Sequence, residues 1–175
     1  MTLTPRLRKF ALTAHVTTSV GWLGAVAGFL ALAVAGLTSR DDQTVRAAYI
    51  AMELTGWFVI VPSSFASLLT GFVVSLGTRW GLFRHYWILA KLLITILAIV
   101  ILLVHMQPIS YIAGVARETA LSGEDLRGLR IQLVADAGAA LLALLAATAQ
   151  TVYKPRGMTR YGWRKEHERR PASQP

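Results

Sequence analysis

The chain contains no cysteine, so disulfide bonds, thiolate zinc sites and iron–sulfur clusters are excluded. Charged residues are also scarce: they make up 15% of the 175 residues, whereas about one quarter of a soluble domain is charged. Hydrophobic residues reach 54%. This composition predicts a single membrane-embedded domain, in which any metal or haem would be bound by His, Met, Asp or Glu.

Four apolar stretches are long enough to cross a bilayer, which takes about 20 mainly apolar residues. We expect helices over about residues 10–37, 47–77, 85–107 and 129–153. Thr4 and Pro5 form an N-cap and first-turn pair that can start the first helix earlier, and Pro108 is expected to end the third. The sequence therefore predicts an all-α polytopic membrane protein, a bundle of four transmembrane helices.

Proline and the small residues predict further features of these helices. Pro62 should kink the second helix and free the carbonyl of Phe58. Gly24 and Gly28 in the first helix, and the alanines between residues 135 and 149 in the fourth, form small faces that we interpret as surfaces for close helix packing. Residues 108–128 are expected to be a loop that contains a short amphipathic helix lying on the membrane.

Basic residues predict the orientation of the bundle. Twelve of the 18 Lys and Arg residues lie before the first helix, between the second and third, or in the tail 154–175, and five lie on the opposite side. The richer side is cytoplasmic by the positive-inside rule. We therefore expect a multi-pass protein of the bacterial plasma membrane with both termini in the cytoplasm. The basic tail should contact anionic lipids, and no nucleic-acid partner is expected.

Ionisable residues inside the four stretches are the best candidates for a functional site, because burying charge in hydrocarbon is costly. Helical rise places His15 and Lys91 at similar depth near the inner boundary. Glu53, His105 and Asp136 fall nearer the outer boundary. The sequence thus predicts two polar layers, one inner and one outer.

The inner layer is a candidate cofactor site made of His15, Lys91 and Trp22. The same residues have simpler interpretations: His15 can hydrogen-bond a neighbouring helix, Lys91 can extend to the cytoplasmic interface, and Trp22 can pack in the core. The outer layer is a candidate metal site made of Glu53, His105 and Asp136. Here the simpler interpretations are that His105 contacts water and that the acids pair with Arg46, Arg130 or His105.

Two of the helices resemble a known group of bacterial membrane proteins. The first helix carries His15 followed by Trp22-Leu23-Gly24, and the third carries Trp87-Ile88-Leu89-Ala90-Lys91-Leu92. This pattern is similar to copper-resistance D and HemJ-type membrane proteins. The whole chain, including Tyr153-Lys154-Pro155-Arg156-Gly157, resembles a set of bacterial four-helix integral membrane proteins in the same neighbourhood. The resemblance implies haem b as a cofactor, with His15 as its ligand and Lys91 as a charged partner.

The sequence leaves three functions open. No nucleophile–base pair or phosphate-binding loop stands out, which favours a non-enzymatic or accessory membrane protein that associates with other membrane subunits. The inner layer favours a haem-b-binding redox protein instead. The outer layer favours proton or metal-ion transport.

Overall fold

The computed structural model describes residues 4–77, 86–118, 124–153 and 164. They form the helices α1 (Pro5–Thr38), α2 (Asp42–Thr55), α3 (Val61–Gly77), α4 (Tyr86–Glu118) and α5 (Glu124–Tyr153), with a π-helical turn, η1 (Gly56–Ile60), between α2 and α3. No strand occurs within these ranges. Because α2, η1 and α3 run on as one helix, the described ranges contain four helices long and apolar enough to cross a membrane. The predicted all-α, four-helix bundle is confirmed.

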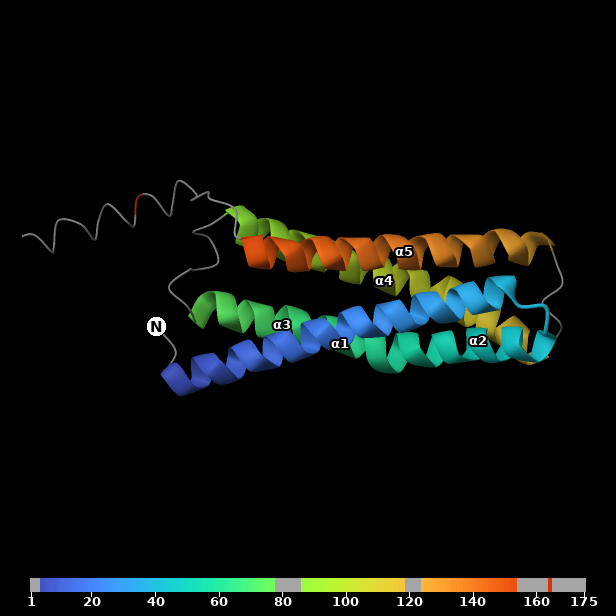
Figure 1. The fold of residues 1–175 in the computed structure, drawn as a ribbon, viewed down its shortest axis with the longest axis horizontal. Helices are drawn as coiled ribbons and strands as arrows, with labels where there is room; N and C mark the ends of the chain where they lie inside the picture. The colour runs from blue at the N-terminus through green and yellow to red at the C-terminus, as the bar shows by residue number, and fades with distance from the viewer. Residues whose placement is uncertain (1–3, 78–85, 119–123, 154–163, 165–175) are drawn as a thin grey trace, which may run out of the picture.

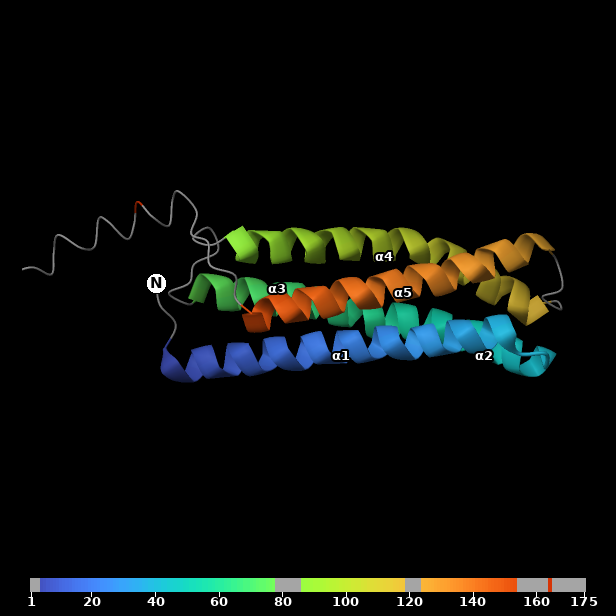
Figure 2. The ribbon, with the colours of Figure 1, turned by 45° about the horizontal axis from the view of Figure 1, so that its top comes forward.

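The four helices lie side by side along the long axis of the molecule (Figures 1 and 2). α1 packs against α2, α3 and α5, and α4 packs against the same three helices from the other side. Consecutive long helices are antiparallel, so α1 begins and α5 ends at one end of the bundle (Figure 1). We call this end the inner end, and the end where α1 passes into α2 the outer end.

Thr4 is the N-cap position of α1 and Pro5 is its first residue, as predicted, but the Thr4 hydroxyl makes no capping hydrogen bond. Only residues 39–41 separate α1 from α2, which begins with Asp41 as N-cap. The Asp41 carboxylate accepts hydrogen bonds from the side chain and the backbone N–H of Thr44, and these bonds hold the pKa of Asp41 below its usual value.

α4 does not end at Pro108, and this prediction was wrong. The helix continues to Glu118, and the residues after Pro108 lie in the bundle rather than on the membrane surface. Ile109, Ile112 and Ala116 are buried against α2 and the rest of the core. Burying this apolar stripe outweighs the one backbone hydrogen bond that proline removes. α5 likewise begins at Glu124, earlier than residue 129.

Pro62 is accommodated by the π-helical turn that precedes it. η1 covers Gly56–Ile60, and the N–H of Val61 bonds the carbonyl of Gly56 at its end. A wider turn at this point lets the helix pass a residue that has no N–H to donate. Gly56 also allows close approach to α4, since a Cβ here would lie 2.8 Å from the sulfur of Met106.

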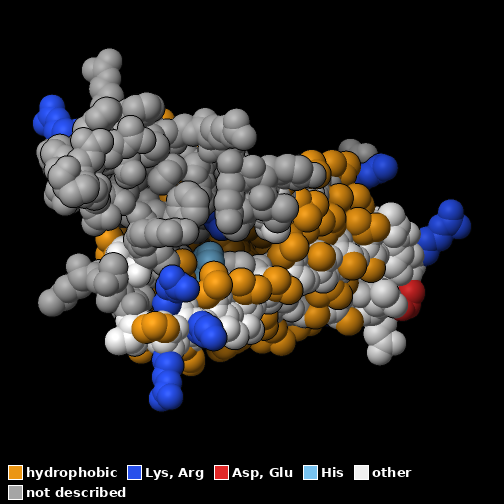
Figure 3. Space-filling view, turned by 60° about the vertical axis from the view of Figure 1, so that its left-hand side comes forward, with side chains coloured by type: hydrophobic (Ala, Val, Ile, Leu, Met, Phe, Trp, Pro, Cys, Tyr) orange, Lys and Arg blue, Asp and Glu red, His pale blue; other side chains and the backbone are white. Residues whose placement is uncertain are grey.

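The large apolar core lies in the outer half of the bundle. It is built around Trp22, Val26 and Phe29 of α1, Met52 of α2 and Met106 of α4. Trp22 is therefore a core residue, as its simpler interpretation has it. On the outside, Figure 3 shows apolar side chains over the middle of the face in view and Lys or Arg side chains at its two ends.

The small-residue face of α1 does not pack inside the bundle. Gly24 and Gly28 are exposed, and a Cβ added at either position would meet nothing within 4 Å beyond its chain neighbours and the backbone of its own helix. The prediction that they bring helices of this chain together was wrong: Trp22, Val26 and Phe29 on the opposite face do so. The predictions for the connection 78–84 and for the tail 154–175 fall on residues outside the described ranges, apart from Arg164.

Candidate functional site

The inner polar layer joins α1 to α3 through imidazole and hydroxyl groups. Nδ1 of His15 lies 3.2 Å from Oγ1 of Thr70, and the Thr18 hydroxyl lies 3.3 Å from the same oxygen. One turn further on, the hydroxyls of Ser19 and Ser67 lie 2.8 Å apart. His15 and Ser19 are on one face of α1, as predicted, and this face meets the hydroxyl groups of α3.

His15 and Lys91 lie close enough to interact electrostatically, although α1 and α4 are diagonal in the bundle. Both side chains are partly buried. On α4, the hydroxyl of Thr95 donates to the carbonyl of Lys91 at 2.8 Å, within one helical turn. The similar depth predicted for His15 and Lys91 is therefore consistent with this geometry, while a shared ligand at the two residues stays a prediction.

The Nδ1 edge of the His15 ring lies against α3. Thr70 is 3.2 Å from Nδ1, and a Cβ at Gly71 would be 3.0 Å from Cε1 and 3.7 Å from Nε2. Trp22, the third residue of the candidate site, is buried in the core. A haem ligand at His15 stays a prediction.

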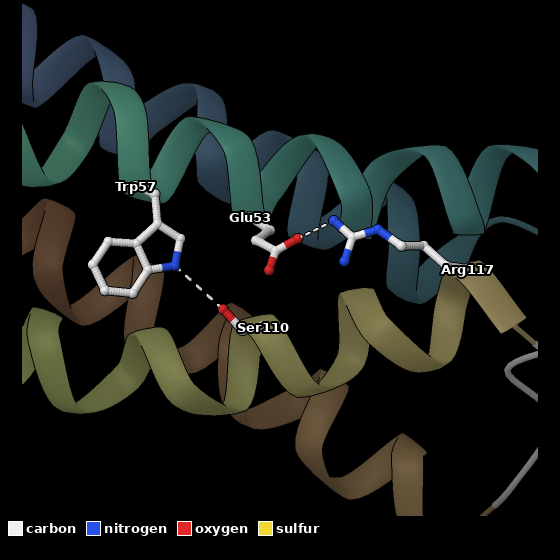
Figure 4. A network of polar contacts seen from close by, with 4 residues as sticks. All are labelled: Glu53, Trp57, Ser110 and Arg117. Atoms are coloured by element: carbon white, nitrogen blue, oxygen red, sulfur yellow. Dashed lines mark hydrogen bonds and ion pairs between the residues drawn. The ribbon is translucent and has the colours of Figure 1, made fainter.

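The outer layer separates into two pairs of interacting side chains. Nε2 of His105 on α4 lies 2.9 Å from Oδ2 of Asp136 on α5. Glu53 of α2 instead pairs with Arg117 of α4, one helix away, next to a hydrogen bond from Trp57 to Ser110 (Figure 4). In the described part of the chain, no three His, Asp or Glu side chains are grouped so that they could hold a metal ion. The structure thus brings His105 and Asp136 together and leaves Glu53 apart.

Arg46 and Arg130, which the sequence offered as partners of the acids, instead make other direct contacts at the outer end. Arg46 donates to the carbonyl of Ala116 at 2.7 Å and to that of Arg117 at 3.3 Å, which are among the last carbonyls of α4. Arg130 donates to the carbonyl of Gly36 near the end of α1. These carbonyls have no partner within their own helices, and the C-terminal end of a helix attracts positive charge. Each arginine therefore caps a neighbouring helix.

Arg130 also anchors the most buried polar side chain of the outer half. Its Nε donates to the hydroxyl of Tyr49 at 2.9 Å, and its guanidinium lies 5.5 Å from the centre of the Tyr49 ring. The ring in turn packs on Gly36. The sequence provided one indication of the contacts of Arg46 and Arg130: both arginines lie on the same side as the predicted ends of two helices. It did not indicate that α4 continues past Pro108, which places the carbonyls of Ala116 and Arg117 within reach of Arg46.

Comparison of the chain with protein-family models, with curated proteins and with solved structures found no match. The resemblance to copper-resistance D and HemJ-type proteins therefore stays a prediction from the residues of two helices. What the geometry itself provides is a set of polar side chains that connect helix to helix.

Proposed function

We propose that this chain is a non-enzymatic, accessory membrane protein that binds laterally to another membrane protein through α1. The observation that carries this proposal is the exposed row of small residues on α1. Gly21, Gly24 and Gly28 follow one another at spacings of three and four residues, and all three have open space where a side chain would be. Thr17 and Ala31 extend the same exposed row at both ends.

Small residues on an outer face allow close approach of a second helix in a bilayer. Lipid tails are as apolar as leucine, so helices associate in membranes through backbone proximity and dense van der Waals contact. A row of glycines removes the side chains that would hold a partner helix away. Facing lipid alone, the same row exposes backbone without any gain in packing.

α5 carries a second face of this kind. Ala135, Ala139, Ala143 and Ala146 are all exposed, and they recur at spacings of three and four residues. The polar side chains inside the bundle are meanwhile engaged between helices, in contacts such as His15–Thr70, Ser19–Ser67 and Glu53–Arg117. Both features favour a role in assembly over a role in chemistry.

The test compares two substitutions that add bulk to α1. Gly24→Leu with Gly28→Leu fills the small row, whereas Val20→Leu with Val34→Leu adds bulk at exposed valines of the same helix. We expect a second membrane protein to co-purify in fixed ratio with the natural chain, and its recovery to fall at least tenfold with the glycine variant only. Equal recovery with both variants would contradict the proposal.

We also propose that the membrane is the bacterial plasma membrane, with the inner end of the bundle in the cytoplasm. The twelve-to-five distribution of Lys and Arg supports this orientation. Because the natural chain has no cysteine, single cysteines can report it without background. Gln43→Cys at the exposed start of α2 should react with an impermeant thiol reagent in intact cells, and Thr4→Cys should not. The reverse labelling would invert the orientation.

A further inference from the structure

Both ring nitrogens of His105 face hydrogen-bond acceptors. Nδ1 lies 2.8 Å from the carbonyl oxygen of Ile101, one turn earlier in α4. Nε2 lies 2.9 Å from Oδ2 of Asp136 in α5. Carbonyl and carboxylate oxygens can both only accept, so a ring that donates to both carries a hydrogen on each nitrogen. A neutral ring has one hydrogen, and when that hydrogen is on Nδ1 the bare Nε2 faces a second acceptor, the carboxylate.

One proton between Nε2 and Oδ2 resolves this conflict. The proton makes either an imidazolium–carboxylate pair or a neutral imidazole that accepts from a carboxylic acid. Oδ2 of Asp136 is buried and has no other hydrogen-bond partner among the described residues. A buried carboxylate oxygen without a donor is costly, so the proton on His105 or Asp136 is what satisfies it.

The pair lies well inside its helices. His105 is 13 residues before the end of α4, and Asp136 is 12 residues after the start of α5. At about 1.5 Å per residue, both are roughly 18–20 Å from the outer ends of their helices. Ionisable side chains within a membrane span generally mark proton or ligand handling, because the bilayer selects against them elsewhere.

Two titratable groups that α2 contributes to the outer half have partners of their own. From α2, Glu53 pairs with Arg117 and Tyr49 bonds Arg130. The described titratable residues of α1 are Arg6, Arg8, Lys9 and His15, all in its inner half, and α3 has none. The proton is therefore shared by His105 and Asp136 across the contact between α4 and α5.

We propose that His105 and Asp136 form a single-proton binding site within the membrane span, and that this proton holds α4 against α5. Loss of the proton leaves two acceptors 2.9 Å apart and pushes the helices apart. At low pH, protonation of the Asp136 carboxylate next to a charged His105 ring removes the charge attraction between the two side chains. The contact between the helices is thus strongest when the pair carries one proton.

A double-mutant cycle measures this directly on the full chain in detergent micelles. His105→Gln, Asp136→Asn and the double variant are compared by thermal unfolding over a range of pH. We expect a coupling of a few degrees in unfolding temperature that disappears as the pH rises and the ring loses its proton. A coupling that is absent at every pH, or one that persists at alkaline pH, would overturn the proposal.

The pair of Glu53 and Arg117 supplies a matched control, since it also joins two helices of the outer half. Glu53→Gln and Arg117→Gln form the second cycle. Its coupling should survive alkaline pH, because a guanidinium keeps its proton there. Only the cycle at His105 and Asp136 should be lost on both sides of neutrality.

A measurement on the natural chain covers the case in which a variant fails to fold. With histidine ring nitrogens and aspartate carboxyl carbons labelled, NMR transfer between them identifies the ring that contacts Asp136. The Nε2 signal of that ring should change from the protonated to the bare form as the pH rises, over the range in which the cycle loses its coupling. A ring that shows no such change, or that changes in a different range, would contradict the proposed site.

Discussion

The inner half of the bundle joins α1 to α3 through hydroxyl groups and one imidazole, whereas the outer half joins α1, α2, α4 and α5 through arginines and carboxylates. The outer half also holds most of the large buried side chains, among them Trp22, Phe29 and Met106. In the inner half the described buried residues are mostly small, such as Ala11, Ser64 and Ser67, and Ile88 is a larger exception. The comparison indicates that stability is concentrated toward the outer end.

The chemistry of the two halves has different energetic consequences. Neutral hydrogen bonds between membrane helices contribute on average about 0.6 kcal/mol, because the separated helices find other partners. An arginine that reaches two acceptors on two helices is harder to replace, since its removal leaves buried polar atoms without a donor. The predictions below test this difference, beginning with the change expected to have the largest effect.

Arg130→Met should destabilise the bundle by about 2–3 kcal/mol, because charged hydrogen bonds to Tyr49 and to the end of α1 are lost together. Thermal unfolding in detergent measures the change. Arg127→Met is the matched control: it lies on the same helix but is exposed. Similar losses of stability for the two variants would show that the bonds of Arg130 to Tyr49 and Gly36 do not hold the helices together.

Gly36→Ala should cost about 1–3 kcal/mol, since the new Cβ would lie 2.8 Å from a buried tyrosine ring that is itself held by Arg130. Gly71→Ala, its counterpart in the inner half, should cost less, because the contact with His15 is longer, at 3.0 Å, and the His15 ring is only partly buried. Gly28→Ala has open space and should gain about 0.5–1 kcal/mol from helix propensity. An unfolding temperature that is lowest for Gly36→Ala, higher for Gly71→Ala and highest for Gly28→Ala would support a more stable outer half. A larger loss for Gly71→Ala than for Gly36→Ala would indicate the reverse.

The hydroxyl pair of Ser19 and Ser67 should show a coupling of about 0.6 kcal/mol in a cycle of Ser19→Ala and Ser67→Ala. Thr17→Ala, exposed on the same helix, is the control and should leave stability unchanged. A coupling as large as the loss caused by Arg130→Met would mean that the inner half is held as strongly as the outer half.

The smallest effect is expected at Asp41, which is fully exposed. Its pKa is lowered in the folded protein by its bonds to Thr44, so its contribution as N-cap of α2 is complete above the ordinary carboxyl pKa. This contribution is lost as the pH falls through the lowered value. Asp41→Asn keeps a capping side chain but removes the titration, so the acid-side loss of α2 helicity, followed by circular dichroism, should weaken. If α2 helicity in Asp41→Asn fell with pH as it does in the natural chain, this role of the Asp41 carboxylate as a titrating N-cap would be excluded.

The sequence by itself determined the number of spanning helices and the place where the first begins. Four apolar runs and the Thr4–Pro5 start are properties of local composition, because the length of an apolar run is set by the thickness of the bilayer. It also identified the polar residues of both layers, since any ionisable residue in an apolar run is conspicuous.

Only the tertiary structure decided which of these residues meet. Pro108 looks like a helix end in the sequence, but burial of Ile109 and Ile112 against other helices carries α4 on to Glu118. This extension brings Arg117 to Glu53, and so leaves His105 to pair with Asp136 alone. The direction in which Gly24 and Gly28 face was equally open, because a small residue fits either a packed interface or an exposed surface. Helix formation is local, whereas partner choice depends on where whole helices pack, and residue spacing along one helix does not contain that information.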